Sequence, residues 1–212
     1  IDDLLEKFCN VNPNRVAPKM LNILRCGTYE LVYCPSVEQY AIVNEAVSQA
    51  PSKRQRGFIN AVLRNICRAI KNRQVPLDLK NPAILPQDTK HGCEFKKPVL
   101  SDYISKPADY LATAFSLPEW LIQEWINRFG TEKATEICFA SNRRCGLYLQ
   151  PNTLKISAQQ LLEKLKTSDK NAEHFKITAD GKMISTTGSG NVTELPGFDE
   201  GLFTVQDPTA AK

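Results

Sequence analysis

The chain has 212 residues, 42% of them hydrophobic, so it can bury a core in one or two domains, which excludes an intrinsically disordered protein. It has no apolar run of about eighteen residues and no secretory leader, so we expect a cytoplasmic protein without membrane contact. Its seven cysteines show no C-x-x-C pair and no metal-ligand spacing, so we expect reduced thiols and no bound metal. The net charge is +4, and the excess of positive charge lies in residues 1–75, which contain eleven Lys/Arg and six Asp/Glu. This excess predicts an anionic partner.

Residues 1–75 are predicted to be helical, because apolar residues recur there every three or four positions. Pro18 suits a first helical turn. Ser36-x-x-Gln39 and Ser52-x-x-Gln55 are both capping-box patterns, in which two side chains satisfy the free amides at a helix start. Four helices fit before Gln74.

Residues 76–102 contain four prolines with polar residues between them and show no sustained period, so we expect a linker or an irregular loop. Helices are predicted to resume over 103–145, a segment that completes or bridges the first domain. Within it, the stretch from Ser116 to Glu119 predicts a capped helix start, and Gly130 predicts the end of that helix.

Residues 146–212 are predicted to form a small α+β domain. The elements expected there are a strand at 147–149, a helix at 157–165, strands at 174–178 and 183–187, a turn at Pro196-Gly197 and a last strand at 202–206. This order is the split β-α-β-β-(short α)-β pattern of ferredoxin-like and RNA-recognition domains. The predicted fold class is therefore a mainly α-helical bundle followed by a small α+β domain.

A basic stripe lies between Ser52 and Arg73, where the chain has seven Lys/Arg residues and no acidic residue. On a helical wheel most of its polar residues share one face and the apolar residues share the opposite face. Most of these basic residues are arginines, and a planar guanidinium can form two hydrogen bonds to one phosphate. The predicted nucleic-acid contacts are Lys53, Arg54, Arg56, Asn60, Arg64, Arg68 and Lys71.

These residues are expected to hold the nucleic-acid backbone, because no aromatic side chains are interleaved with them for base stacking. Two other interpretations stay open: an ordinary solvated helix face, and a surface that docks an acidic protein. A solvated face normally carries carboxylates four residues from its bases, and this segment has none. Nucleic-acid binding is the interpretation we favour.

Two sets of motifs carry a resemblance to known families. The stretches 24–31, 42–47 and 57–64 resemble the NusB-like helical domain, which occurs alone in a transcription antitermination factor and also fused to methyltransferases. A second set of stretches resembles the linker of the RsmB (Sun/Fmu) family and the segment that leads into the cofactor domain of that family. These stretches are 117–121, Trp125, Phe129-Gly130, 140–142 and 198–207.

The RsmB resemblance implies an enzyme that transfers a methyl group from S-adenosylmethionine to carbon 5 of a cytosine in small-subunit ribosomal RNA. It implies that Gln206 and Asp207 pack near a C-terminal methyltransferase domain absent from these 212 residues. Where the family has an arginine in a Leu-Arg-x-Asn motif, this chain has Gln150, which puts an RNA contact from that position in doubt. The neighbouring basic pair Arg143 and Arg144 is a candidate for secondary RNA contacts.

The chemistry of the family requires a thiolate, supplied by a Pro-Cys dipeptide, that adds to carbon 6 of the cytosine ring. The sequence contains no Pro-Cys and no convincing glycine-rich cofactor loop. We therefore expect no catalytic residue and no bound S-adenosylmethionine in this segment, although the full-length protein would use that cofactor. The alternative is a non-enzymatic, NusB-like RNA-binding regulator of transcription.

Overall fold

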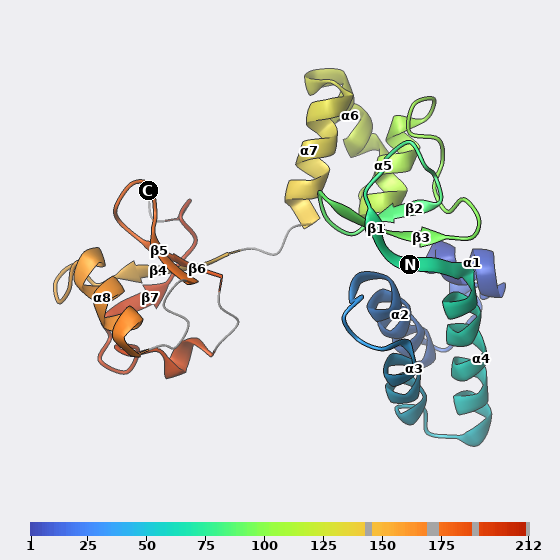
Figure 1. Ribbon diagram of the computed structural model, residues 1–212, viewed down its shortest axis with the longest axis horizontal. Helices are drawn as coiled ribbons and strands as arrows, with labels where there is room; N and C mark the ends of the chain where they lie inside the picture. Colours follow the sequence, from blue (N-terminus) through green and yellow to red (C-terminus); the bar gives the residue numbers. More distant parts are fainter. Residues whose placement is uncertain (143–145, 169–173, 188–190, 211–212) are drawn as a thin grey trace. The chain divides into compact units, whose positions relative to one another are not determined.

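The computed structural model describes residues 1–142, 146–168, 174–187 and 191–210 (Figure 1). The chain divides into two compact units, 1–143 and 144–212. No helix in these described ranges is both long and apolar enough to cross a bilayer.

The first unit begins with four helices, as predicted. They are α1 (Asp2–Cys9), α2 (Pro18–Tyr33), α3 (Gln39–Ser48) and α4 (Lys53–Ala69), with the short 3-10 helix η1 (Pro13–Arg15) between the first two. The capping box of α4 is confirmed, because Ser52 and Gln55 exchange backbone-to-side-chain hydrogen bonds of 3.3 Å. The box expected at Ser36 is wrong, since α3 starts after Glu38 without a side-chain cap.

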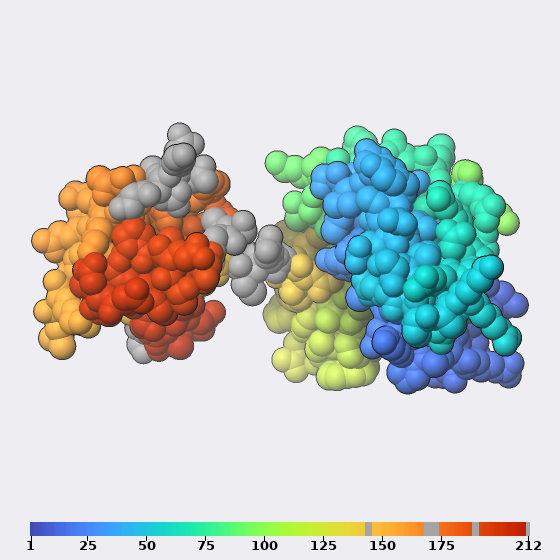
Figure 2. All heavy atoms as spheres, turned by 90° about the horizontal axis from the view of Figure 1, so that it is seen from below, coloured from blue at the N-terminus to red at the C-terminus, as the bar shows by residue number. Residues whose placement is uncertain are grey.

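Helix α4 packs its apolar face against α2, and Ile59, Leu63 and Ile66 are fully buried there. The two helices approach closely at Gly27, where an added Cβ would lie 2.8 Å from Cδ1 of Leu63. Figure 2 shows the atoms of α2, α3 and α4, coloured blue to cyan, gathered in one part of this unit. The contacts of α4 with α2 and α3 leave its polar face toward solvent.

A three-stranded antiparallel sheet follows α4, in the order β1-β3-β2. Its strands are β1 (Ile70–Pro76), β2 (Ile84–Pro86) and β3 (His91–Phe95). The expected helix therefore ends earlier than Arg73, and residues 76–102 are not a linker, because Leu85, Cys93 and Phe95 are buried in the core. Strands of three to seven residues that pair with distant segments leave no period in the sequence long enough to detect.

Three further helices complete the unit: α5 (Pro107–Phe115), α6 (Glu119–Phe129) and α7 (Thr131–Asn142). Figure 1 shows the sheet between these helices and the α2–α4 group, and one continuous hydrophobic core joins both groups. Gly130 ends α6 with a φ of 81°, as predicted. The cap expected at Ser116 is wrong: Ser116 has a left-handed φ of 56° and ends α5, while Pro118 precedes α6.

The second unit has the predicted order of elements. They are β4 (Leu147–Pro151), α8 (Ala158–Ser168), β5 (Phe175–Ile177), β6 (Ile184–Thr186), the 3-10 helix η3 (Val192–Glu194) and β7 (Phe203–Val205). The antiparallel sheet has the order β5-β6-β4-β7, and α8 buries Leu161 and Leu165 against it. The predicted fold class, mainly α followed by a small ferredoxin-like α+β domain, is confirmed.

Candidate nucleic-acid interface

The exposed face of α4 carries a row of polar side chains about one helical turn apart, three of them arginines. Arg56, Asn60, Arg64 and Arg68 are all exposed and follow each other at intervals of four residues. Lys53 and the neighbouring Arg54 are exposed in the first turn. We call Lys53, Arg54, Arg56, Asn60, Arg64 and Arg68 the α4 stripe.

Among the described residues, no carboxylate neutralises the charges of the α4 stripe. No ion pair in the described part of the chain involves a cation of the stripe. Arg68 donates to the side-chain oxygen of Asn65 at 2.6 Å, and Arg56 donates to the carbonyl of Ala50 at 2.9 Å. Both acceptors are uncharged and leave guanidinium donors free for an anion.

Lys71 does not lie on α4 as expected but on β1, where it pairs with Glu94 of β3 at 2.8 Å. Its side chain is 61% exposed, so this is a surface pair that contributes little to stability. The pairing offsets its charge, and Lys71 is the weakest of the predicted contacts.

Arg73, the last basic residue of the sequence run, has a structural role. Its guanidinium donates to five backbone carbonyls at the end of α2 and in the following turn. These acceptors are Glu30, Leu31, Cys34, Pro35 and Val37. Because the last carbonyls of a helix have no partner within it, Arg73 completes α2 and is unavailable to a ligand.

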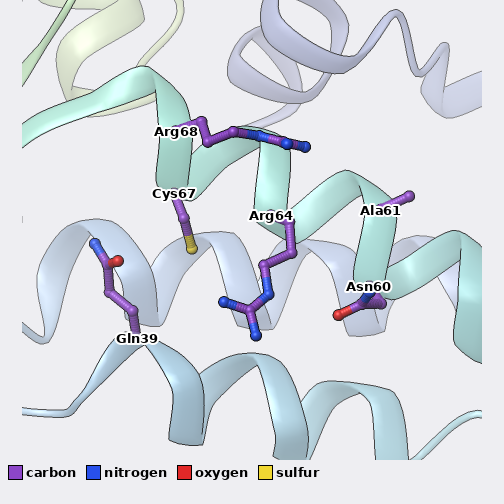
Figure 3. A pocket seen from close by; sticks show the side chains of 6 residues that line it. All are labelled: Gln39, Asn60, Ala61, Arg64, Cys67 and Arg68. Atoms are coloured by element: carbon purple, nitrogen blue, oxygen red, sulfur yellow. The ribbon is translucent and has the colours of Figure 1, made fainter.

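A pocket of about 550 Å³ lies between α3 and α4 (Figure 3). Figure 3 shows Arg64 extending from α4 toward α3, and Gln39 extending from the start of α3 toward α4. The residues that line the pocket are Gln39, Asn60, Ala61, Arg64, Cys67 and Arg68. None of these lining residues is acidic, so the pocket is suited to an anionic or neutral polar ligand.

Cys67 adds no negative charge to this pocket. Burial raises the pKa of its thiol, and the nearby Arg64 and Arg73 offset that effect only in part. A thiol whose pKa is raised stays protonated near neutral pH, so Cys67 presents a small, uncharged surface.

Three further thiols, those of Cys9, Cys93 and Cys138, are buried or half-buried in the first unit. Burial raises the pKa of Cys9 and of Cys138 to about 11, and that of Cys93 to about 12. His91, the first residue of β3, pairs with Asp88 at 3.0 Å. Within the described ranges, no three His, Cys, Asp or Glu side chains are grouped in a way that could hold a metal ion.

The remaining predicted residues lie in or next to the second unit. Arg143 and Arg144 fall outside the described residues. Gln206 donates its backbone amide to Tyr148 of β4, and Asp207 accepts a 2.7 Å bond from the amide of Thr209. The hydroxyl and the amide of Thr209 lower the pKa of the Asp207 carboxyl. The hydrogen-bond partners of this carboxyl therefore lie within its own turn.

Gln150, which stands where the RsmB family has an arginine, lies on β4 opposite Thr204 of β7. Its side-chain oxygen is buried and has no hydrogen-bond partner in the described structure. A neutral amide at this position cannot replace the charge of the family arginine.

Family models match both units of the fold. Residues 1–68 match the NusB family, and residues 117–189 match the ferredoxin-like domain of RsmF/B-like methyltransferases. The chain therefore combines a NusB region with an RsmF/B-type ferredoxin-like domain. This combination confirms the resemblance to the RsmB family in both parts of the chain.

Three similar curated proteins are named as small-subunit ribosomal RNA methyltransferases. The chain is 26% identical to "Probable ribosomal RNA small subunit methyltransferase B" of Bacillus subtilis, over 99% of this chain and 41% of that protein. It is 24% identical to the protein of the same name from Synechocystis, over 99% of this chain and 42% of that protein. For "Ribosomal RNA small subunit methyltransferase B" of Yersinia pseudotuberculosis the identity is 28%, over 89% of this chain and 36% of the relative.

The chain thus spans about two fifths of the length of these relatives. A solved structure, "Crystal Structure of PH0851", has the same fold, with a TM-score of 0.63 and 16% identity. That match covers 99% of this chain and 41% of the solved chain.

Proposed function

We propose that this chain is the RNA-binding N-terminal portion of an S-adenosylmethionine-dependent methyltransferase that modifies carbon 5 of a cytosine in small-subunit ribosomal RNA. The observation that carries the RNA-binding role is the α4 stripe, whose cations form no ion pair among the described residues. The names of the relatives and the two family matches support the enzyme class.

The α4 stripe supports backbone binding through its geometry. Arg64 and Arg68 are four residues apart on one helix, so their side chains start about 6 Å apart along the axis and can reach neighbouring phosphates. Each guanidinium can form two parallel hydrogen bonds to phosphate oxygens. Phosphate contacts of this kind give affinity and register rather than sequence recognition.

Chemistry and substrate binding are divided between domains in this proposal. The described cysteines with resolved pKa shifts have raised values, which does not suit a catalytic thiolate. The cofactor and the reactive cysteine would belong to a methyltransferase domain of the full-length cytoplasmic protein. Gln206 and Asp207 would lie beside that domain, and Arg143 and Arg144 would add RNA contacts.

The NusB match supports a second candidate, an RNA-binding regulator of transcription without enzymatic activity. The RsmF/B match over residues 117–189 favours the enzyme. The complete coding sequence distinguishes the two, because the enzyme requires a glycine-rich turn after a strand and a Pro-Cys dipeptide beyond the ferredoxin-like domain. A coding sequence without these features would leave the regulator as the better candidate.

RNA binding by the 212-residue chain is expected to depend strongly on salt. If about four cations of the α4 stripe meet phosphates, the logarithm of the association constant should fall with the logarithm of salt concentration with a slope of about −3 on single-stranded RNA. Fluorescence anisotropy with a labelled fragment of small-subunit ribosomal RNA measures this slope. A slope near zero would contradict binding through the stripe.

A further inference from the structure

We infer that the pocket between α3 and α4 holds one unpaired RNA base, bound by the amides of Gln39 and Asn60 while Arg64 and Arg68 hold the adjoining phosphates. This inference rests on the proposed RNA-binding function. It adds that the interface prefers single-stranded RNA and contacts bases as well as the backbone.

The side-chain amides of Gln39 and Asn60 have unused hydrogen-bonding capacity. In the described structure neither Gln39 nor Asn60 has a hydrogen-bond partner for its side chain, and both line the pocket. The amide nitrogen of Gln87, in contrast, donates to the backbone carbonyls of Val32 and Arg73, although its buried side-chain oxygen has no partner among the described residues. A free amide presents a donor and an acceptor in one plane, which matches the edge of a nucleobase.

The size and the lining of the pocket suit a nucleobase. Its volume of about 550 Å³ falls within the range of small-ligand sites, roughly 300–1,000 Å³, and exceeds what one water or ion requires. Ala61 and the neutral thiol of Cys67 provide small, weakly polar surfaces against which a flat ring can lie. The charged groups among the lining residues are Arg64 and Arg68, so base and phosphate binding are combined in one place.

The position of the pocket favours single-stranded RNA over a duplex. In a duplex the Watson–Crick edges are already paired, and the deep, narrow major groove of A-form RNA keeps side chains from the bases. Gln39 and Asn60 lie on different helices, on either side of the pocket. A base must therefore leave its stack and enter between α3 and α4, which an unpaired nucleotide does at least cost.

The test compares two labelled probes with the same backbone: an oligouridylate of about ten nucleotides, and the same strand with abasic central positions. In fluorescence anisotropy the unaltered chain should bind the abasic strand about tenfold more weakly, the discrimination expected for a well-formed amide–base contact. The double variant Gln39→Ala/Asn60→Ala should bind both probes with the affinity that the unaltered chain has for the abasic strand. Asn44→Ala, an exposed amide on α3 outside the pocket, is the matched control and should behave as the unaltered chain does.

The outcomes separate the two proposals. Equal binding of both probes by the unaltered chain overturns the base pocket while leaving backbone binding in place, and this comparison needs no variant to fold. An unchanged preference in a folded Gln39→Ala/Asn60→Ala variant also overturns it. No binding of either probe, even at low salt, would instead refute the RNA-binding function itself.

Discussion

Reversing the charge of Arg64 and Arg68 to glutamate is expected to weaken RNA binding on the order of a hundredfold at low salt. Each arginine contributes charge-assisted hydrogen bonds of about 1.5 kcal/mol or more to phosphate, and the loss of two such contacts amounts to about 3 kcal/mol. The salt slope should also become shallower, from about −3 to roughly −1.5, because two fewer counterions are released. Anisotropy titrations over a range of salt concentrations measure both quantities.

The matched control reverses Arg128 and Lys133 to glutamate, which changes the net charge by the same amount. These exposed residues belong to α6 and α7, across the sheet from α4 in Figure 1. They pair with Glu124 and Glu136 on the surface, so little stability depends on them. If both double variants weaken binding equally, net charge rather than the α4 stripe determines affinity, and the assignment of the stripe is refuted.

Replacing Arg73 with methionine is expected to lower the free energy of unfolding by about 3 kcal/mol. The substitution keeps part of the aliphatic volume but leaves five backbone carbonyls without their charged donor. Arg73→Lys should lower the free energy of unfolding by an intermediate amount, because one ammonium group cannot reach all the carbonyls that the planar guanidinium contacts. Urea unfolding followed by circular dichroism measures the difference.

Lys71→Met serves as the control on the same strand. Lys71 is exposed and forms one surface ion pair, so its loss should cost less than about 1 kcal/mol. Equal effects of Lys71→Met and Arg73→Met would contradict the structural role of Arg73.

The contrast between these two residues shows where sequence reasoning succeeds and where it ends. The amphipathic pattern of residues 53–69 is local and repeats over several turns, so the buried Ile59, Leu63 and Ile66 and the exposed arginines could both be predicted. Extending the same helix to Arg73 was wrong, because β1 is stabilised by pairing with β3, whose partner residues lie fifteen or more positions away in sequence. Sequence alone could not show that pairing.

Gln39 was missed as a site residue for a similar reason. Its spacing from Ser36 imitates a capping box, but the structure starts α3 at Gln39 itself and directs its amide toward α4. A pocket between two helices depends on how they pack, and neither helix encodes that packing alone. No signal within residues 36–39 pointed to the pocket.

Local sequence was enough to establish the helices of the first unit, the cationic face of α4, the order of elements in the second unit and the family resemblance. These features depend on periods, caps and motifs contained in short stretches of chain. Three-dimensional packing was needed to establish that Arg73 completes α2, that residues 70–95 form a sheet, and that Gln39 joins Asn60 and Arg64 around one pocket. The physical reason is that these arrangements are stabilised by contacts between residues far apart in the chain, whose partners leave no mark on the local pattern.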